Sequence, residues 1–102
     1  MLKKHHQIIH SIAKKYQPQQ IIVYGSVAQN KTKSNSDLDL IVIKNTKKNF
    51  YDRIQSINKT FTPSIPTDIV VYTPKEFKNI SRWSYFIQQE VLKKGQIVYD
   101  SQ

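Results

Sequence analysis

Two aspartates separated by a single residue are the feature of this chain most able to do chemistry. Asp37 and Asp39 stand at the start of a predicted strand, about Asp37 to Lys44, whose apolar run is Leu40-Ile41-Val42-Ile43. Side chains at positions i and i+2 of a strand share a face and are about 7 Å apart along the backbone, so both carboxylates should point the same way. Two like charges held together are costly unless a cation compensates them, and hard divalent cations prefer oxygen ligands. The pair therefore predicts a Mg²⁺ site.

A third carboxylate, Asp68, stands near the start of another predicted strand, Thr67 to Thr73. Alternation along that strand places Asp68, Val70 and Tyr72 on one face. A lone aspartate in a strand is usually a solvated edge residue. If this strand lies beside the strand of Asp37, however, three carboxylates converge at one edge of a sheet and form a site for one or two Mg²⁺ ions.

A glycine turn precedes the acidic pair. Gly25-Ser26 ends an apolar stretch, Gln20 to Tyr24, that predicts a strand buried on both faces. Glycine permits a tight turn and close approach of a ligand, and Ser26 is expected to cap a first helical turn at 27–29 whose N–H groups favour phosphate oxygens. A Gly-Ser pair alone is more typical of an ordinary strand-to-helix turn. Its position ten residues before Asp37 favours a nucleotide site instead.

Gly25-Ser26, ten intervening residues, Asp37-Leu38-Asp39 and the later Asp68 together resemble the signature of the polymerase-β-type nucleotidyltransferase superfamily. The shortness of the chain resembles the minimal nucleotidyltransferases, which include antitoxins paired with HEPN-domain proteins. The resemblance covers roughly positions 20 to 100. It implies a palm-like α/β fold: a small mixed sheet with helices packed mainly on one face.

The resemblance also implies an activity, the Mg²⁺-dependent transfer of AMP from ATP to an acceptor hydroxyl with release of pyrophosphate. Asp37 and Asp39 would hold both metal ions, and Asp68 would complete the ion facing the acceptor and help to deprotonate its hydroxyl. The Gly25 backbone and the Ser26 hydroxyl would hold the β- and γ-phosphates. The acceptor implied is a tyrosine of a HEPN-domain toxin, which would be the partner of this chain.

The chain departs from the family pattern after the glycine turn. A basic residue commonly follows the Gly-Ser pair and a glycine often ends the short helix, but Val27, Gln29 and Asn30 occupy that segment here. The basic residues nearby that are candidates to replace the missing phosphate clamp are Lys31, Lys33 and Lys44.

Three other functions stay open. The chain resembles subunits of small-molecule nucleotidyltransferases of the antibiotic-modifying type. It is also consistent with a non-catalytic antitoxin that masks its partner. As a lesser alternative, the net charge of +9 favours electrostatic binding of RNA.

Composition sets the general class. A length of 102 residues predicts one domain, 1–102, and the absence of cysteine excludes disulfides and thiolate metal sites. The sequence contains neither an apolar signal-peptide core nor a stretch long enough to span a membrane, so we expect a cytoplasmic protein. Self-association and association with a partner both remain open.

The remaining elements are predicted from apolar periodicity. Helices are expected at 2–16, 48–60, 73–80 and 82–94, and a final strand at 96–99. His5, His6 and His10 lie on the first helix and are interpreted as a solvated face rather than metal ligands, because no further ligand accompanies them. Trp83 is a candidate to contact a base or a partner, but we interpret it as a core or interface anchor.

Overall fold

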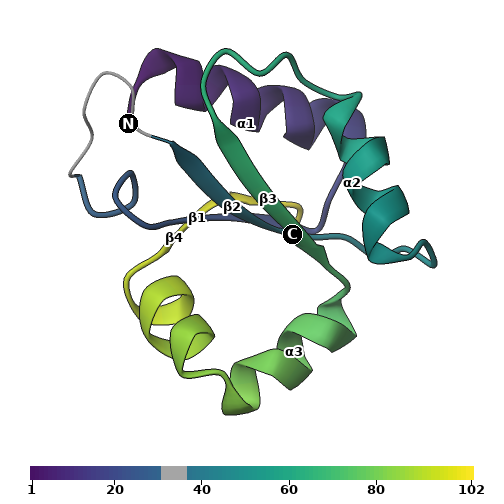
Figure 1. Ribbon diagram of the computed structural model, residues 1–102, viewed down its shortest axis with the longest axis vertical. Coiled ribbons are helices and arrows are strands. Elements are labelled where there is room, and N and C mark those ends of the chain that lie inside the picture. The colour runs from purple at the N-terminus through teal and green to yellow at the C-terminus, as the bar shows by residue number, and fades with distance from the viewer. Residues whose placement is uncertain (31–36) are drawn as a thin grey trace.

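The computed structural model describes residues 1–30 and 37–102 and contains one four-stranded mixed sheet (Figure 1). The strand order is β3-β2-β1-β4. β1 is antiparallel to β2 and β4, whereas β2 and β3 are parallel. The strands are β1 (Gln20–Tyr24), β2 (Leu38–Ile43), β3 (Thr67–Tyr72) and β4 (Gln96–Asp100), which confirms every predicted strand to within one residue at each end.

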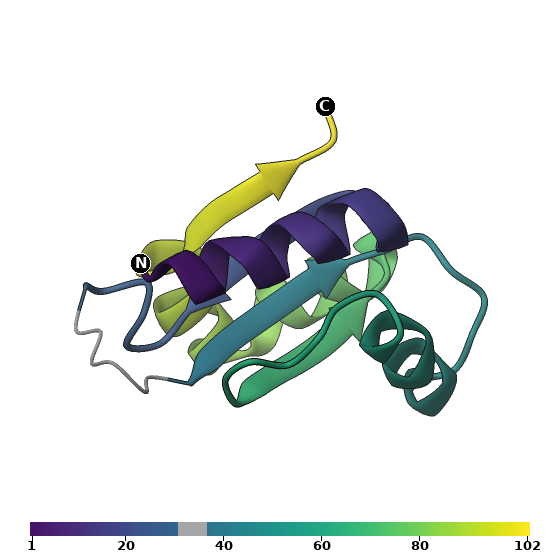
Figure 2. The ribbon, with the colours of Figure 1, turned by 90° about the horizontal axis from the view of Figure 1, so that it is seen from above.

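Helices cover both faces of the sheet, and the expectation that they pack mainly on one face is wrong (Figures 1 and 2). α1 (Lys3–Tyr16) and α2 (Phe50–Asn58) pack on the face that carries Leu38, Leu40 and Val42. α3 (Pro74–Trp83) and η1 (Ile87–Lys93) pack on the opposite face, over Ile41 and Ile43. The inner strands β1 and β2 are apolar on both sides, so each face needs its own cover.

The predicted helix at 82–94 is divided in two. α3 continues past its expected end to Trp83, where Ser84 adopts an extended conformation, and η1 then follows as a π-helix. Ile87 and Val91 of η1 are buried against the sheet. Within the described part of the chain, no helix combines the length and apolar character needed to cross a membrane.

His5 differs from its predicted role on a solvated face, while His6 and His10 are exposed as expected. The His5 side chain is fully buried, and its Nδ1 accepts a hydrogen bond of 3.0 Å from the backbone N–H of Leu2. The first turn of a helix has N–H groups without helical partners, and His5 satisfies one just before α1. His5 is therefore a structural residue of the N-terminus.

Arg53 connects the two helical layers around the edge strand β3. Its side chain is only 6% exposed, and it donates hydrogen bonds to the carbonyls of Lys48 (2.7 Å) and Val71 (3.1 Å). The same guanidinium binds both carboxylate oxygens of Glu76, at 2.7 and 3.2 Å. Glu76 and Thr73 also form a capping box at the start of α3. Arg53 thereby joins α2, β3 and the start of α3.

Replacing Arg53 by methionine should lower the free energy of unfolding by about 2–3 kcal/mol, because two backbone carbonyls and a carboxylate lose their donor. The hydrogen bond from Arg53 lowers the pKa of Glu76 below its ordinary value of 4.5. Stability from this pair is therefore present above pH 4.5 and lost as the pH falls, and R53M should flatten that acid dependence. Urea denaturation at several pH values measures both effects. The matched control R82M alters an exposed arginine and should change stability by less than about 0.5 kcal/mol.

Candidate functional site

The sheet brings Asp39 and Asp68 together. In the parallel pairing of β2 and β3 the two residues are direct Cα partners, so their side chains leave the sheet side by side on the same face. This is the face of Ile41 and Ile43, under α3 and η1. Asp37 is exposed and stands one residue before β2, at the same end of the sheet. The structure thus places Asp39 and Asp68 side by side, with Asp37 at the same end of the sheet.

The electrostatics of Asp39 reflect this crowding. Its pKa is raised above the ordinary value of 3.8, first by burial, then by the negative charges of Asp68 and Asp37 and by a hydrogen bond to the Asp68 side chain. Each cause favours the protonated form over the carboxylate. A cation placed between the carboxylates would reverse the effect of their mutual repulsion.

Gly25 lies directly against Asp39. Its φ of +77° is in the region that favours glycine, and a Cβ atom added there would stand 2.7 Å from Oδ2 of Asp39. Any larger residue at 25 would strain the turn and displace the carboxylate. The Gly25 backbone and the acid site are therefore one structural unit, as the sequence spacing indicated.

The expected helical turn after Ser26 is absent, so Ser26 is not the N-cap that the sequence predicted. Residues 26–30 form consecutive turns in which Ser26 and Val27 carbonyls accept from the N–H groups of Gln29 and Asn30, at 3.2 and 3.3 Å. Asn30 takes the left-handed conformation, φ +58°, which asparagine tolerates better than most residues. Ser26 itself is exposed.

Neither position 27 nor Lys44 supplies a cationic side chain for a phosphate clamp. Val27 is only 2% exposed and belongs to the core, so position 27 does not present a side chain to a ligand. Lys44 follows the far end of β2, where its ammonium donates to the carbonyls of Tyr16 (2.8 Å) and Gln17 (3.2 Å). The prediction for Lys44 is therefore wrong. Lys31 and Lys33 lie outside the described residues.

Two residues of the site were missed by the sequence reasoning. Tyr24 is the Cα partner of Asp39, and its pKa is raised by burial and then by the charges of Asp39 and Asp68. Gln96, the first residue of β4, donates a 2.6 Å hydrogen bond from its side chain to the carbonyl of Ala28. Tyr24 is signalled by its place just before Gly25. Gln96 gives no sequence signal, because the bond spans 68 residues.

The donor set fits a hard divalent cation in chemistry, since it consists of carboxylate oxygens. Among residues 1–30 and 37–102, no three carboxylates or imidazoles are already arranged as a ligand cluster. Of the predicted ligands, Asp39 and Asp68 are adjacent and Asp37 lies at the same end of the sheet, so their assignment to Mg²⁺ stays a prediction.

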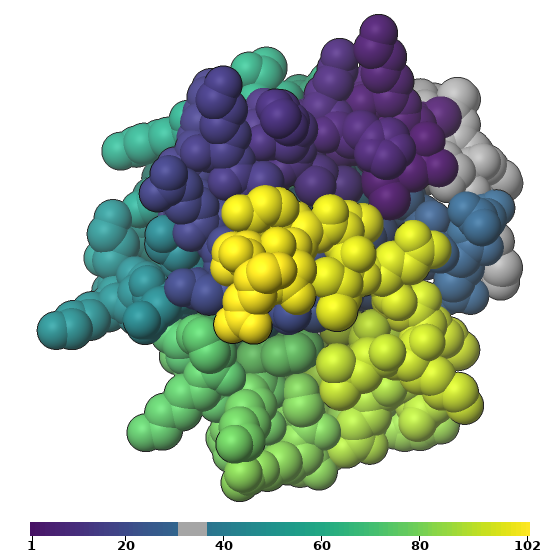
Figure 3. Space-filling model, turned by 180° about the vertical axis from the view of Figure 1, so that it is seen from behind, coloured from purple at the N-terminus to yellow at the C-terminus, as the bar shows by residue number. Residues whose placement is uncertain are grey.

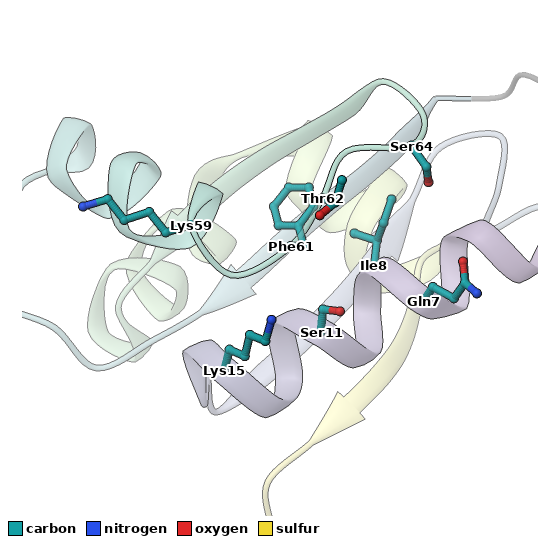
Figure 4. A pocket seen from close by; sticks show the side chains of 8 residues that line it. All are labelled: Gln7, Ile8, Ser11, Lys15, Lys59, Phe61, Thr62 and Ser64. Carbon is teal, nitrogen blue, oxygen red and sulfur yellow. The ribbon is translucent and has the colours of Figure 1, made fainter.

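A separate hollow of about 310 Å³ lies on the opposite face of the sheet, between α1 and the segment after α2 (Figure 4). Lys15 and Lys59 are its charged residues, and Figure 4 shows Lys59 directed away from the others. The remaining lining residues are polar or apolar without an acid: Gln7, Ile8, Ser11, Phe61, Thr62 and Ser64. The hollow carries no carboxylate, so the candidate chemistry belongs to the Asp39 face.

Comparison with known families agrees with this geometry. The sequence profile of the family described as Polymerase beta, Nucleotidyltransferase matches residues 6–102. The match extends over nearly the whole chain and includes the glycine turn and all three carboxylates. The chain belongs to this family of nucleotidyltransferases.

Two solved structures share the fold. A Sulfolobus solfataricus protein assigned as a nucleotidyltransferase is 18% identical, with a TM-score of 0.67 over 99% of this chain and 81% of its own. A toxin–antitoxin structure with AMP-PNP is 20% identical, with a TM-score of 0.61 over 99% of this chain and 76% of its own. At these identities the likeness establishes the nucleotidyltransferase fold. A search of curated proteins finds no significant match.

Asp39→Asn should make the protein more stable than the wild type at neutral pH. The raised pKa means that ionising Asp39 costs folding free energy above about pH 3.8. The amide removes that cost, so the difference in stability between variant and wild type should vanish in acid.

At a concentration roughly 100-fold above its Kd, Mg²⁺ should stabilise the wild type by about 2–3 kcal/mol and D39N far less. Thermal unfolding with and without Mg²⁺ measures both; equal stabilisation of wild type and D39N would contradict the metal site. Asp52→Asn, an exposed change on α2, should behave as wild type.

Gln96→Ala should loosen the turn at residues 25–30, because the Ala28 carbonyl loses its side-chain donor. Hydrogen exchange should accelerate at the amides of Gln29 and Asn30. The matched control is Gln88→Ala, which removes a comparable 3.0 Å bond to the Ser81 carbonyl within the α3–η1 layer. Both variants should lose about 1 kcal/mol of stability, but only Q96A should affect the turn. Unchanged hydrogen exchange at residues 29 and 30 in Q96A would show that Gln96 does not position the turn.

Proposed function

We propose that this nucleotidyltransferase transfers AMP from ATP to a hydroxyl group of a protein partner, in the manner of an antitoxin that modifies its toxin. The observation that carries the proposal is the pairing of Asp39 with Asp68 on one sheet face, against the backbone of Gly25. Adjacent carboxylates are suitable ligands for a metal ion, and a glycine beside them lets a polyphosphate approach the backbone closely. Together they suit a metal-dependent reaction of a polyphosphate.

In this reaction the acceptor hydroxyl oxygen attacks the α-phosphorus of ATP. A new P–O bond forms to the acceptor, the bond from the α-phosphorus to the bridging oxygen of the β-phosphate breaks, and pyrophosphate leaves. The hydroxyl proton passes to a carboxylate, for which Asp68 is the candidate. Asp37 and Asp39 would hold Mg²⁺, and the Gly25 backbone and Ser26 hydroxyl would contact the β- and γ-phosphates. Bound Mg²⁺ supplies neutralisation of the charge that develops on the phosphate oxygens.

The choice of ATP and of a protein acceptor is supported by the fold comparison. The toxin–antitoxin structure that this chain resembles was solved with AMP-PNP, an ATP analogue. Family membership by itself is consistent with other nucleotides and acceptors. We further propose a HEPN-domain toxin as partner, with a tyrosine hydroxyl as the acceptor, following the resemblance to minimal nucleotidyltransferases.

A non-catalytic antitoxin is the second candidate. Val27 is buried where relatives commonly carry a basic residue, and Lys44 is bonded to the end of α1, so neither offers a cation to a triphosphate. A protein of this kind would inhibit its partner by covering it, with the acid site as a remnant. Transfer of AMP to a small molecule, the third alternative, would differ from both in giving a labelled product of low molecular weight.

Incubation with α-labelled ATP and Mg²⁺ in a lysate of the source organism tests the proposal. Label should enter a protein band only when Mg²⁺ is present. It should remain with the protein through acid precipitation and washing. Asp39→Asn and Asp68→Asn should each lower transfer by roughly 100- to 10,000-fold, whereas the exposed Asp52→Asn should retain it. Label in a small molecule would indicate the antibiotic-modifying type. Neutralisation of the partner by D39N without label transfer by either protein would establish masking.

A further inference from the structure

Exposed apolar side chains gather on one layer of the molecule. In the described part of the chain, seven large hydrophobic residues are exposed, and five of them fall between positions 83 and 97. These five belong to the end of α3, to the segment between α3 and η1, to η1 and to β4. The η1 segment forms the yellow-green part of the surface in Figure 3. They are Trp83, Tyr85, Phe86, Leu92 and Ile97. Exposed apolar surface concentrated in this way indicates a binding region.

Three of these exposed residues are aromatic and lie at the break between α3 and η1. Trp83 is 70% exposed, Tyr85 67% and Phe86 51%. Phe86 meets Tyr24 edge to face, with ring centroids 5.7 Å apart, and Tyr24 is the Cα partner of Asp39. The aromatic group therefore begins next to the acid site and extends away from it toward α3.

The preceding helix adds positive charge. Lys75, Lys78 and Arg82 line one shallow hollow of about 440 Å³ on α3, together with Asn79 and Glu76. Glu76 is the only acid there, and its charge is offset by the 2.7 Å ion pair with Arg53. No acidic residue occurs from position 77 to 89. The hollow is thus cationic, and the aromatic residues of positions 83–86 follow its last lining residue, Arg82, directly along the chain.

The geometry points to a binding strip for single-stranded nucleic acid, formed by Lys75, Lys78, Arg82, Trp83, Tyr85 and Phe86. Exposed rings offer flat faces on which unpaired bases stack, and the adjacent cations suit a phosphate backbone. A duplex keeps its base faces covered, so it would use the cations but not the rings. An acidic peptide would satisfy the charges without using the three exposed rings. The inference goes beyond the proposed transferase activity and does not depend on it.

The test uses the full chain and a fluorescein-labelled RNA of about 12 nucleotides without secondary structure, within the range of single-strand site sizes. Trp83 is the only tryptophan, so stacking should also quench the protein's intrinsic fluorescence. Anisotropy should show binding that weakens steeply between about 50 and 200 mM salt. Trp83→Ala and Tyr85→Ala should each weaken binding roughly 10-fold, and Arg82→Ala should lower the salt slope by about one.

Matched controls come from the other face of the sheet. Tyr51→Ala removes an aromatic ring that is also 70% exposed, and Lys59→Ala removes one exposed positive charge; both should bind RNA as the wild type does. Circular dichroism confirms folding of each variant. D39N should bind RNA normally, which separates this strip from the transferase proposal.

Four outcomes would overturn the inference. One is the absence of RNA binding, and another is binding that is indifferent to W83A and Y85A. Equal affinity for a duplex of the same length would show simple attraction to phosphate. Equal affinity for poly-glutamate of matched charge would assign the strip to an acidic protein partner instead.

Discussion

The parallel register between β2 and β3 is the constraint on which the site depends. It makes Asp39 and Asp68 direct neighbours, although mutual repulsion and partial burial both oppose the ionised form of Asp39. The main-chain ladder and the apolar residues of the two strands hold the carboxylates in place against this cost. A bound cation would offset the repulsion between the two carboxylates, and this links the fold to the proposed chemistry.

The elements around this pair hold the neighbouring turn and edge strand in position. Gly25 allows the backbone of the preceding turn to approach the Asp39 carboxylate, and Gln96 holds that turn from β4. On the other side, Arg53 fixes the edge strand that carries Asp68 to both helical layers. The two sheet faces then have different roles. α1 and α2 cover one face, while the other face carries Asp39 and Asp68 and is covered by α3 and η1, the layer with the exposed aromatic residues.

Strands and the acid spacing could be predicted from the sequence because their causes are local. β-branched runs between polar turns set the strands, and the alternation along them places the aspartates. The helix boundaries were less predictable. Ser84 is extended and divides the predicted helix at 82–94. The π-helix that follows buries Ile87 and Val91, whose spacing of four residues is also typical of an α-helix. The family pattern also suggested a helix after Ser26, where consecutive turns occur instead.

The sequence by itself determined the residue types, the strand positions and the separation of Gly25 from Asp37, since these follow from the order of residues and the backbone preferences of each. Only the tertiary structure decided that Asp68 meets Asp39, that Lys44 is bonded to α1 and that Gln96 reaches Ala28. Those contacts join residues distant in the chain, and strand pairing and packing, rather than local preference, bring them together. The same packing decided that helices cover both faces, because each apolar face of the inner strands must be buried.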